Sequence, residues 1–376
     1  MKPKIFVSID TINVGGPGKG ILQFLRCGGN DLAQPIIVSF DTGSIEKWQF
    51  RDEVQKLDVP FLALKQRMTY DPLLIPQAYH LIKRHKIQIL QSHGYKGHIL
   101  CLALKIMTGL PWIAFVHGWT AEDFKIKLYS KLDRLILGFA DRVVVVSESL
   151  KKQLNMNWID GKKVRTIVNA IDPSEYKELS INKSVRDTHG IKDDEKAVGV
   201  VGRFSPEKGH KYFIDAFRLV REHIQNIKAM LVGEGQDKDL LMEKVKKYKL
   251  DEHVIFTGYQ KQMVPYYLTF DLVVIPSLSE GMPNVALEAM LFEKPVVATD
   301  VGGIPEVVID DVTGMLVKPM NPELLADAII NVISSPELMS QYGKAGKERI
   351  LSEFNPKTRV DKIISLYKEL LSHRKV

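Results

Sequence analysis

Two acidic residues at a fixed separation, Glu280 and Glu288, are the chain's most informative chemical feature. The segment 271–276 before them is a β-branched run typical of a buried strand, and residues 284–291 form an apolar stretch typical of a helix. At about 1.5 Å of rise per residue, a helix starting at residue 284 carries Glu288 roughly one turn inside and leaves Glu280 before its first turn. Each carboxylate can then bind hydroxyl groups at one end of an elongated ligand.

The backbone between the two glutamates suits an anion. Gly281, Met282 and Asn284 supply amide groups around the first helical turn, where helices leave such groups unpaired, and a helix N-terminus attracts negative charge. A ligand with a diol, a diphosphate and a sugar in that order, such as a nucleotide sugar, matches this arrangement. The alternative is a capped helix with two solvated glutamates, which would be the simpler interpretation for two acids at arbitrary spacing.

A second group of charged residues follows another predicted strand further upstream. Residues 197–201 are apolar and lead into the loop 202–209, Gly-Arg-Phe-Ser-Pro-Glu-Lys-Gly. Gly202 permits close approach of the backbone, and Arg203 and Lys208 would both leave the carboxyl end of a parallel strand, where open α/β sheets bind ligands. A guanidinium and an ammonium together suit a diphosphate, because hydrogen bonds to charged groups contribute roughly 1.5 to 3 kcal/mol each. Because an exposed Arg and an exposed Lys are common on protein surfaces, this loop indicates a binding site only in combination with Glu280 and Glu288.

Together the two motifs resemble those of the retaining glycosyltransferases of family four. The second domain of that family carries a Gly-Arg-x-x-x-x-Lys-Gly-like loop followed by a Glu-x7-Glu signature. The resemblance extends over most of the chain, through Gly15-Gly16 near the amino terminus and His117 after a mid-domain strand. It implies an α/β chain of GT-B fold, in which two Rossmann-like α/β/α domains face each other across a deep cleft that holds the donor. One departure is Gly118, where many members have aspartate, and it puts a local contact in doubt.

The resemblance also implies roles for individual side chains. Arg203 and Lys208 would bind the donor diphosphate, Glu280 would contact the donor sugar, and Glu288 would contact the ribose. His117 would lie beside the donor sugar and orient a hydroxyl group, with proton transfer as a further role. We therefore predict His117, Arg203, Lys208 and Glu280 as catalytic residues. The expected donor-binding positions are Gly15, Gly16, Gly202, Gly258, Gly281, Met282, Pro283, Asn284, Val285 and Glu288, and His93, at another strand end, is a weaker candidate.

The glycine-rich segment 13–20 fits neither common phosphate-binding fingerprint. A P-loop requires a glycine where Asn13 stands and a serine or threonine where Gly20 stands. A dinucleotide fingerprint requires a third glycine that the segment lacks. What remains is a flexible turn between the first strand and the first helix, whose amides, above all that of Gly16, can approach a ligand. The alternative is a tight turn with no ligand.

Composition is that of an ordinary globular protein. The chain has 376 residues, enough for two domains, of which 45% are hydrophobic and 26% are charged. We find no apolar run near the roughly 20 residues that a membrane span needs. The amino terminus turns acidic at Asp10 before a signal-peptide core develops, so export is not expected. Cys27 and Cys101 are too few for a disulfide framework, and a cytoplasmic location is the simplest expectation.

Positive charge is concentrated in the amino-terminal half. Residues 1–170 hold 24 Lys and Arg against 14 Asp and Glu, and the remaining residues hold 28 against 31. The segment 124–137 is predicted as an amphipathic helix with basic residues on its exposed side, and 83–86 adds a second basic cluster. This pattern predicts reversible contact with the inner face of an anionic membrane, beside the alternative of a solvated helix face. Nucleic acid is not expected as a partner, because exposed aromatics are not interleaved with the basic residues.

The order of predicted elements is strand then helix throughout, as in parallel α/β sheets. The predicted strands are 4–9, 36–40, 87–91, 112–116, 142–146, 164–168, 198–201, 229–232, 254–256, 272–275, 295–298 and 314–317, with helices at 73–84 and 97–108 among others. Polar turn formers at 169–173 suggest a boundary between an acceptor-side domain, 1–170, and a donor-binding domain, 171–355. The terminal helix, about 356–376, is expected to pack back on the first domain, as it does in the resembled family.

The spacing Asp237-Lys238-Asp239 is the Asp-x-Asp by which another glycosyltransferase architecture holds a divalent ion. It opens a predicted polar helix here, so capping and the macrodipole explain it, and we expect neither a metal nor another cofactor. The function expected is retaining transfer of a sugar from a nucleotide diphosphate, with UDP as the expected nucleotide, to a glycan or lipid-linked acceptor in bacterial polysaccharide, O-antigen or lipid-linked glycan synthesis. The alternatives are a sugar-nucleotide epimerase of the same fold and a non-catalytic glycan- or membrane-binding protein.

Overall fold

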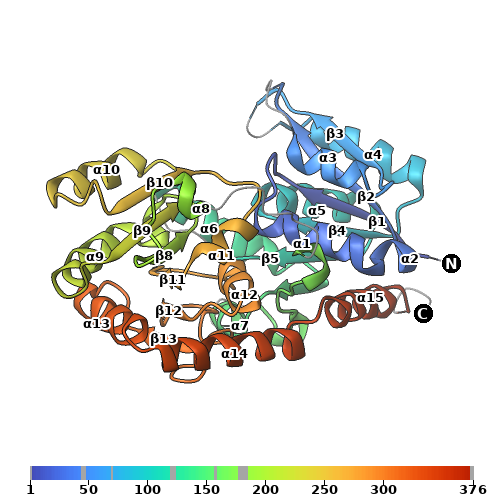
Figure 1. Cartoon of the computed structure of the whole chain (residues 1–376). Helices are drawn as coiled ribbons and strands as arrows, with labels where there is room; N and C mark the ends of the chain where they lie inside the picture. The colour runs from blue at the N-terminus through green and yellow to red at the C-terminus, as the bar shows by residue number, and fades with distance from the viewer. Residues whose placement is uncertain are drawn as a thin grey trace. The chain divides into compact units, whose positions relative to one another are not determined.

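The computed structural model describes residues 2–43, 48–68, 71–118, 124–155, 159–176 and 185–372, with the side chains of residues 124–130 and 155 outside the description. The chain forms two structural units (Figure 1). Unit 1 comprises Met1–Ala170 and Pro356–Val376, and unit 2 comprises Ile171–Asn355. The last four positions of the predicted terminal helix, 373–376, lie outside the described residues.

Unit 1 is built on a parallel sheet of seven strands among its described residues, in the order β3-β2-β1-β4-β5-β6-β7. The strands are β1 Lys4–Ile9, β2 Gln34–Asp41, β3 Phe61–Lys65, β4 Ile89–His93, β5 Trp112–Val116, β6 Arg142–Val145 and β7 Val164–Thr166. Strands β1, β4 and β5 are buried along almost their whole length, which explains their continuous apolar and β-branched sequences. The edge strand β3 is only half buried, and its sequence lacks such a run.

Helices of unit 1 cover both faces of this sheet. They are α1 Gly16–Phe24, η1 Leu25–Gly29, α2 Asn30–Leu32, α3 Gln49–Gln55, α4 Leu74–His85, α5 Tyr95–Thr108, α6 Phe124–Leu137, α7 Glu148–Asn155, η2 Gly161–Lys163 and α15 Pro356–Ser372. Side chains of α1, α3 and α15 share one apolar core with β1, β2 and β4. Figure 1 shows α15, in red, next to the blue elements of this unit. Residues from the two ends of the chain therefore share one core.

Unit 2 repeats the pattern, and its described part holds a sheet of six strands in the order β10-β9-β8-β11-β12-β13. They are β8 Lys196–Val201, β9 Ile227–Val232, β10 Val254–Gly258, β11 Leu272–Ile275, β12 Val296–Thr299 and β13 Gly314–Val317. The described helices are η3 Pro173–Tyr176, α8 Val185–Thr188, η4 Pro206–Lys208, α9 His210–His223, α10 Lys238–Lys247, α11 Val264–Thr269, α12 Asn284–Leu291, α13 Pro322–Ile333 and α14 Pro336–Glu353. Side chains of α9, α10 and α13 form the main core with the sheet, and Asn321 caps α13 by accepting from the Leu324 amide at 2.9 Å.

Both sheets have the strand order of the doubly wound fold, which reverses direction once. The reversal falls between β1 and β4 in unit 1 and between β8 and β11 in unit 2. Loops that leave the carboxyl ends of two such strands diverge, and the crevice that results is where open α/β sheets bind ligands. The two loops at the reversal of unit 2 are 202–209 and 276–283, which are the two charged motifs of the sequence.

Candidate active site

The loop after β8 is held rigid by its own polar side chains. Phe204 is fully buried and its amide donates to the Glu234 carbonyl at 2.9 Å, which anchors the loop to the segment after β9. The exposed Arg203 guanidinium donates to Glu207 Oε1 at 2.7 Å, and the buried Ser205 hydroxyl donates to the same oxygen at 2.6 Å. The guanidinium is therefore positioned before any ligand arrives.

Backbone geometry brings the second loop against the first. Gly209 has φ +68°, and a Cβ atom built on it would lie 1.9 Å from the Pro276 carbonyl oxygen, so only glycine fits. The Leu278 amide donates to the Glu207 carbonyl at 2.7 Å, which closes the two loops on each other. The turn that ends the first motif thus rests directly on the start of the second.

This contact places Lys208 against Glu280. The ammonium group lies 2.6 Å from Glu280 Oε1, and the Ser277 hydroxyl donates to the same oxygen at 2.8 Å. Behind the glutamate, Gly302 has φ +56° and approaches so closely that a Cβ there would lie 1.9 Å from the Glu280 carbonyl oxygen. The acid is therefore fixed at both its backbone and its side chain, with its cationic partner at the edge of solvent.

Glu288 lies elsewhere, one turn inside α12 as predicted. Its side chain is only 4% exposed, and the buried Tyr267 hydroxyl of α11 donates to its Oε2 at 2.8 Å. Burial and the Glu288 carboxylate raise the pKa values of Tyr267 and Tyr176 above the ordinary tyrosine value. The structure thus joins Glu280 to Lys208 but places Glu288 among tyrosines.

The other predicted donor-binding positions of unit 2 lie at the same edge of its sheet as these loops. Gly281, Met282 and Pro283 are buried before α12, and Asn284 and Val285 begin the helix partly exposed. Gly202 donates its amide to the Val232 carbonyl at 3.0 Å, and Gly258 ends β10, where its carbonyl accepts from the Gly233 amide at 3.0 Å. Gly202, Gly258 and the segment 281–285 therefore lie at the carboxyl edge of the same sheet.

A histidine of this loop was not predicted as functional. His210, the first residue of α9, is 3% exposed and packs edge-on against Phe204 with ring centroids 4.9 Å apart. Among the described residues neither of its ring nitrogens has a hydrogen-bond partner. Burial, then the Lys208 charge, lowers its pKa to about 3, so the ring is neutral. Its position directly after Lys208-Gly209 was the only sequence signal available.

In unit 1 the predicted residues gather around β4 and β5. His93 ends β4 and lies buried against His117, which follows β5, with His93 Nδ1 3.0 Å from His117 Nε2. Burial, followed by the Arg359 and His98 charges, lowers the pKa of His117 to about 3. Burial is also the main cause that lowers the pKa of His93, so both rings are neutral near pH 7. The weaker candidate of the sequence, His93, is thus the direct partner of the stronger one.

The glycine turn of unit 1 is open. Gly15 is the N-cap of α1 and Gly16 its first residue, and a Cβ built on Gly15 meets no atom within 4 Å. Proline at the second helical position suits this start, because its missing amide donor is not needed there. The described residues thus leave space beside the Gly15 backbone.

The structure differs in one detail from the capping role predicted for the Asp237-Lys238-Asp239 segment. Asp237 is the N-cap of α10, but its side chain makes no capping hydrogen bond, so only Asp239 in the first turn fits the helix-terminus explanation. Among the residues that the structure describes, no group of three or more His, Cys, Asp or Glu side chains is arranged to hold a metal ion. Within the same residues, every helix is too short or too polar to cross a membrane.

The fold and this arrangement define a GT-B glycosyltransferase. The family model described as Glycosyltransferase Family 4 matches residues 15–175, and that of Glycosyl transferases group 1 matches residues 182–349. The chain belongs to family 4 of the glycosyltransferases, as the resemblance of its motifs implied.

Individual relatives agree with this assignment. The chain is 25% identical to the UDP-Gal:alpha-D-GlcNAc-diphosphoundecaprenol alpha-1,3-galactosyltransferase of Escherichia coli, over 86% of each chain. It is 27% identical to the N-acetyl-alpha-D-glucosaminyl L-malate synthase of Bacillus anthracis, over 80% of this chain and 78% of the relative. The crystal structure of Anabaena HepE in complex with UDP and glucose shares its fold, with a TM-score of 0.85 and 20% identity over 98% of this chain and all of that chain.

Proposed function

We propose that this glycosyltransferase moves a sugar from a UDP-sugar to an acceptor hydroxyl with retention of anomeric configuration. The observation that carries the proposal is the Lys208 to Glu280 contact at 2.6 Å, between the two loops where the sheet of unit 2 reverses. The diphosphate would take the Lys208 ammonium and the Arg203 guanidinium, which leaves Glu280 to bind hydroxyls of the sugar. Solved complexes of a similar fold with UDP, and a relative that uses UDP-Gal, support uridine as the base.

The chemistry follows from where charge develops. As the bond between the anomeric carbon and the diphosphate oxygen breaks, negative charge gathers on the leaving group. Positively charged and backbone donors that are already in place stabilise this charge most at the transition state. We propose that the acceptor oxygen bonds to the carbon on the same face while its proton passes to the departing phosphate oxygen. Arg203, Lys208 and amides at the head of α12 would neutralise the diphosphate without a metal ion.

The acceptor is proposed to be a glycan or a lipid-linked sugar. This class is supported by the Escherichia coli relative, whose acceptor is a sugar on diphosphoundecaprenol. The Bacillus anthracis relative, named for a malate product, indicates that acceptors differ between members. Synthesis of bacterial polysaccharide, O-antigen or lipid-linked glycan is accordingly the proposed setting.

The donor proposal is tested by thermal unfolding with UDP, GDP and ADP, followed by product analysis. A ligand at one hundred times its Kd stabilises the native state by about 2.7 kcal/mol, so UDP is expected to raise the Tm by roughly 5 to 10 °C. A larger rise in Tm with GDP or ADP than with UDP would contradict uridine as the base of the donor. Incubation with UDP-sugar and lipid-linked acceptors should release UDP and give the α-glycoside from an α-linked donor. A β-glycoside would exclude retention, and a new nucleotide sugar formed from donor alone would identify an epimerase.

We propose in addition that unit 1 contacts an anionic membrane surface. Ile106 of α5 is 76% exposed, and Leu135 of α6 and Phe139 just after it are 66% and 63% exposed. Lys105 donates to the Phe139 carbonyl at 2.9 Å, which brings the ends of the two helices together. Leu132 and Leu135 are exposed on α6, whose described exposed side is thus partly apolar where the sequence analysis expected basic residues. Unit 1 holds 30 Lys and Arg against 16 Asp and Glu, a charge that suits anionic lipid.

Sedimentation with vesicles tests this contact. The protein should sediment with vesicles that contain phosphatidylglycerol and much less with pure phosphatidylcholine, because both apolar insertion and charge contribute. A Leu135→Glu, Phe139→Glu variant is expected to lose most of the bound fraction. Leu240→Glu, at a leucine that is also exposed but belongs to unit 2, is the matched control. Equal sedimentation of all three proteins would refute the proposed surface.

A further inference from the structure

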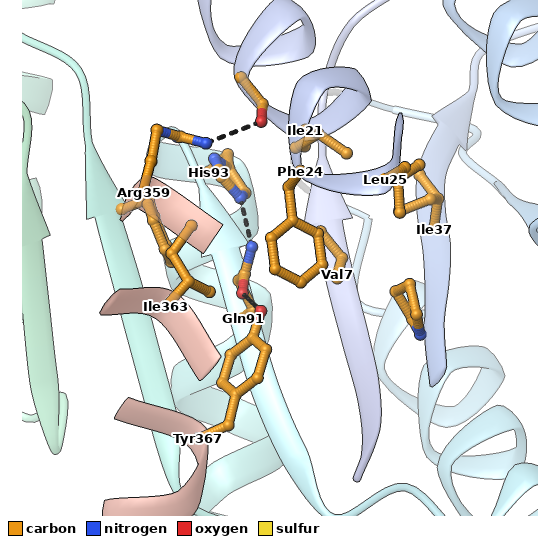
Figure 2. A pocket seen from close by; sticks show the side chains of 13 residues that line it. Val7, Ile21, Phe24, Leu25, Ile37, Gln91, His93, Arg359, Ile363 and Tyr367 are labelled. Carbon is orange, nitrogen blue, oxygen red and sulfur yellow. Dashed lines mark hydrogen bonds between the residues drawn. The ribbon is translucent and has the colours of Figure 1, made fainter. Parts of the chain in front are cut away.

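A continuous line of hydrogen bonds runs from the last helix of the chain to His117. The Tyr367 hydroxyl of α15 donates to Gln91 Oε1 at 2.5 Å, and Gln91 Nε2 lies 2.8 Å from His93 Nε2. His93 Nδ1 in turn lies 3.0 Å from His117 Nε2. Figure 2 shows Tyr367, Gln91 and His93 in line along the wall of a small cavity, with Arg359 from the same terminal helix beside the histidine. All of these residues belong to unit 1.

The chemistry of the groups gives this line a direction. A hydroxyl that meets Gln91 Oε1 must donate to it, which fixes the orientation of the amide. Gln91 Nε2 carries only donors, so His93 Nε2 must accept, and a neutral His93 then carries its proton on Nδ1. His93 Nδ1 donates to His117 Nε2, so a neutral His117 carries its own proton on Nδ1. The side-chain amide of Gln91 therefore determines, through His93, the tautomer of His117.

We call this line of hydrogen bonds from Tyr367 to His117 the relay. Packing holds its rings in the positions that these hydrogen bonds need. The His93 ring packs against Phe115, at a centroid distance of 4.8 Å, and against His117, at 5.3 Å, with interplanar angles of 18° and 20°. Tyr367 is buried and meets Phe24 edge-on at 6.3 Å. Neither Tyr367 nor His93 can therefore turn away without disturbing the core of unit 1.

A buried cation adds to the effect of burial in keeping both imidazoles neutral. Arg359 is buried at the start of α15 and donates to the Gly20 carbonyl at 2.9 Å, and among the described residues it forms no ion pair with an acid. After burial itself, this charge is among the causes that lower the pKa values of His93 and His117. A protonated His93 would have to donate from both nitrogens and would face the donor of Gln91. The helix that supplies Tyr367 thus also supplies a charge that, after burial, disfavours protonation of His93 and His117.

We propose that Tyr367 and Gln91 are positioning residues that hold His117 as the Nδ1-H tautomer. In this state Nε2 is already occupied by His93, and His117 meets the donor sugar as a hydrogen-bond donor. It cannot then remove the acceptor proton through Nε2, which agrees with transfer of that proton to the leaving phosphate. The inference rests on the proposed function, in which His117 lies beside the donor sugar. It makes the terminal helix part of the catalytic apparatus of unit 1.

The test reads the tautomers directly in protein labelled with ¹⁵N-histidine, through couplings from ring nitrogens to ring carbon-bound protons. The expected wild-type pattern is Nδ1-H for both His93 and His117. In Tyr367→Phe the Gln91 amide is free to turn and can accept from His93, so a mixture with the Nε2-H form should appear. In Gln91→Leu the direction of the relay is lost altogether. Tyr342→Phe, which also removes a buried tyrosine hydroxyl but in unit 2, is the control and should keep the wild-type tautomers.

Activity gives a second readout. Loss of an outer partner of a site histidine should lower kcat about tenfold or more in Tyr367→Phe and Gln91→Leu, with the UDP-induced Tm shift unchanged because the nucleotide binds unit 2. The relay would be overturned if His117 in the wild-type protein carried its proton on Nε2. It would also be overturned if Tyr367→Phe and Gln91→Leu both kept the wild-type tautomers and the wild-type kcat. His117→Ala separates the two proposals: normal kcat in that variant would remove His117 from the proposed mechanism, whereas the tautomers of the wild type decide the relay by themselves. Tyr367→Phe alone suffices if Gln91→Leu does not fold.

Discussion

Replacing Lys208 with alanine is expected to lower kcat by about 100- to 1,000-fold, the usual cost of removing one preorganised group that stabilises developing negative charge. Lys208 is held 2.6 Å from Glu280 at the point where the sheet of unit 2 reverses, with one face open to solvent. A diphosphate that displaces this contact gains an ammonium partner that is already in place. Because a hydrogen bond to a charged group contributes roughly 1.5 to 3 kcal/mol, UDP binding should also weaken by about 10- to 150-fold.

Steady-state release of UDP and calorimetric titration with UDP measure the two effects. Lys211→Ala is the matched control, because Lys211 lies three positions further on, is exposed, and places its ammonium over the Tyr212 ring at 4.9 Å. The control should retain wild-type kcat and UDP affinity. If Lys208→Ala folds with an unchanged Tm and still turns over and binds UDP normally, the diphosphate is not bound where we place it.

Much of the sheet could be predicted because buried parallel strands carry their own signal. The predicted strands 4–9, 112–116, 272–275 and 314–317 have the boundaries that the structure gives to β1, β5, β11 and β13. Each is a short apolar or β-branched run between turn formers. The strand β3, Phe61–Lys65, was missed because it lies at the sheet edge and only one of its five residues is buried. Its pattern differs little from that of a loop.

The candidate site could be predicted only to the level of the loops. Sequence spacing correctly placed Glu280 before a helix and Glu288 inside it, since both follow from the position of the helix start. It could not show that Glu280 would meet Lys208, because that contact depends on the left-handed backbone of Gly209 against Pro276. Nor could it show that Tyr267, on another helix, would hold Glu288.

Long-range side-chain partners were beyond any local pattern. Tyr367 and Gln91 are 276 residues apart in the chain, and neither belongs to a motif. His210 was missed for a different reason, because a histidine at the start of a helix is an ordinary residue until its burial, and the absence of a hydrogen-bond partner for its ring among the described residues, are known. The sequence shows which groups reach the edge of a sheet, and the packing of distant helices decides what those groups touch.

Replacing Glu280 with glutamine is expected to separate binding of the nucleotide from transfer of the sugar. The amide keeps the shape of the carboxylate and can still accept from the Ser277 hydroxyl, but the negative charge that pairs with Lys208, and that we propose binds sugar hydroxyls, is lost. Loss of a hydrogen bond to a charged group in the transition state predicts a fall in kcat of about 10- to 150-fold. UDP affinity should change by less than about threefold, or rise, because Lys208 becomes free to bind phosphate.

The matched control is Glu293→Gln, which removes the charge of another Glu-Lys pair of unit 2, with Lys347 at 2.8 Å, where both side chains are solvent-exposed. Exposed pairs contribute little, so this variant should behave as wild type. A drop in UDP affinity as large as the drop in kcat would show that Glu280 acts through the diphosphate or through the fold, and would count against its assignment to the sugar.

The double variant Lys208→Ala, Glu280→Gln then tests whether the two residues act on one ligand. If the lysine binds phosphate and the glutamate binds sugar hydroxyls, each single change still leaves the other contact, so the double variant should lose clearly more kcat/KM than either single variant, with a coupling term because the two side chains are in contact. If the pair instead works only as a structural link between the two loops, either single change already breaks it, and the second should cost almost nothing more. Unfolding in UDP-free buffer gives the companion measurement, because only the structural link predicts equal losses of stability in both single variants and in the double.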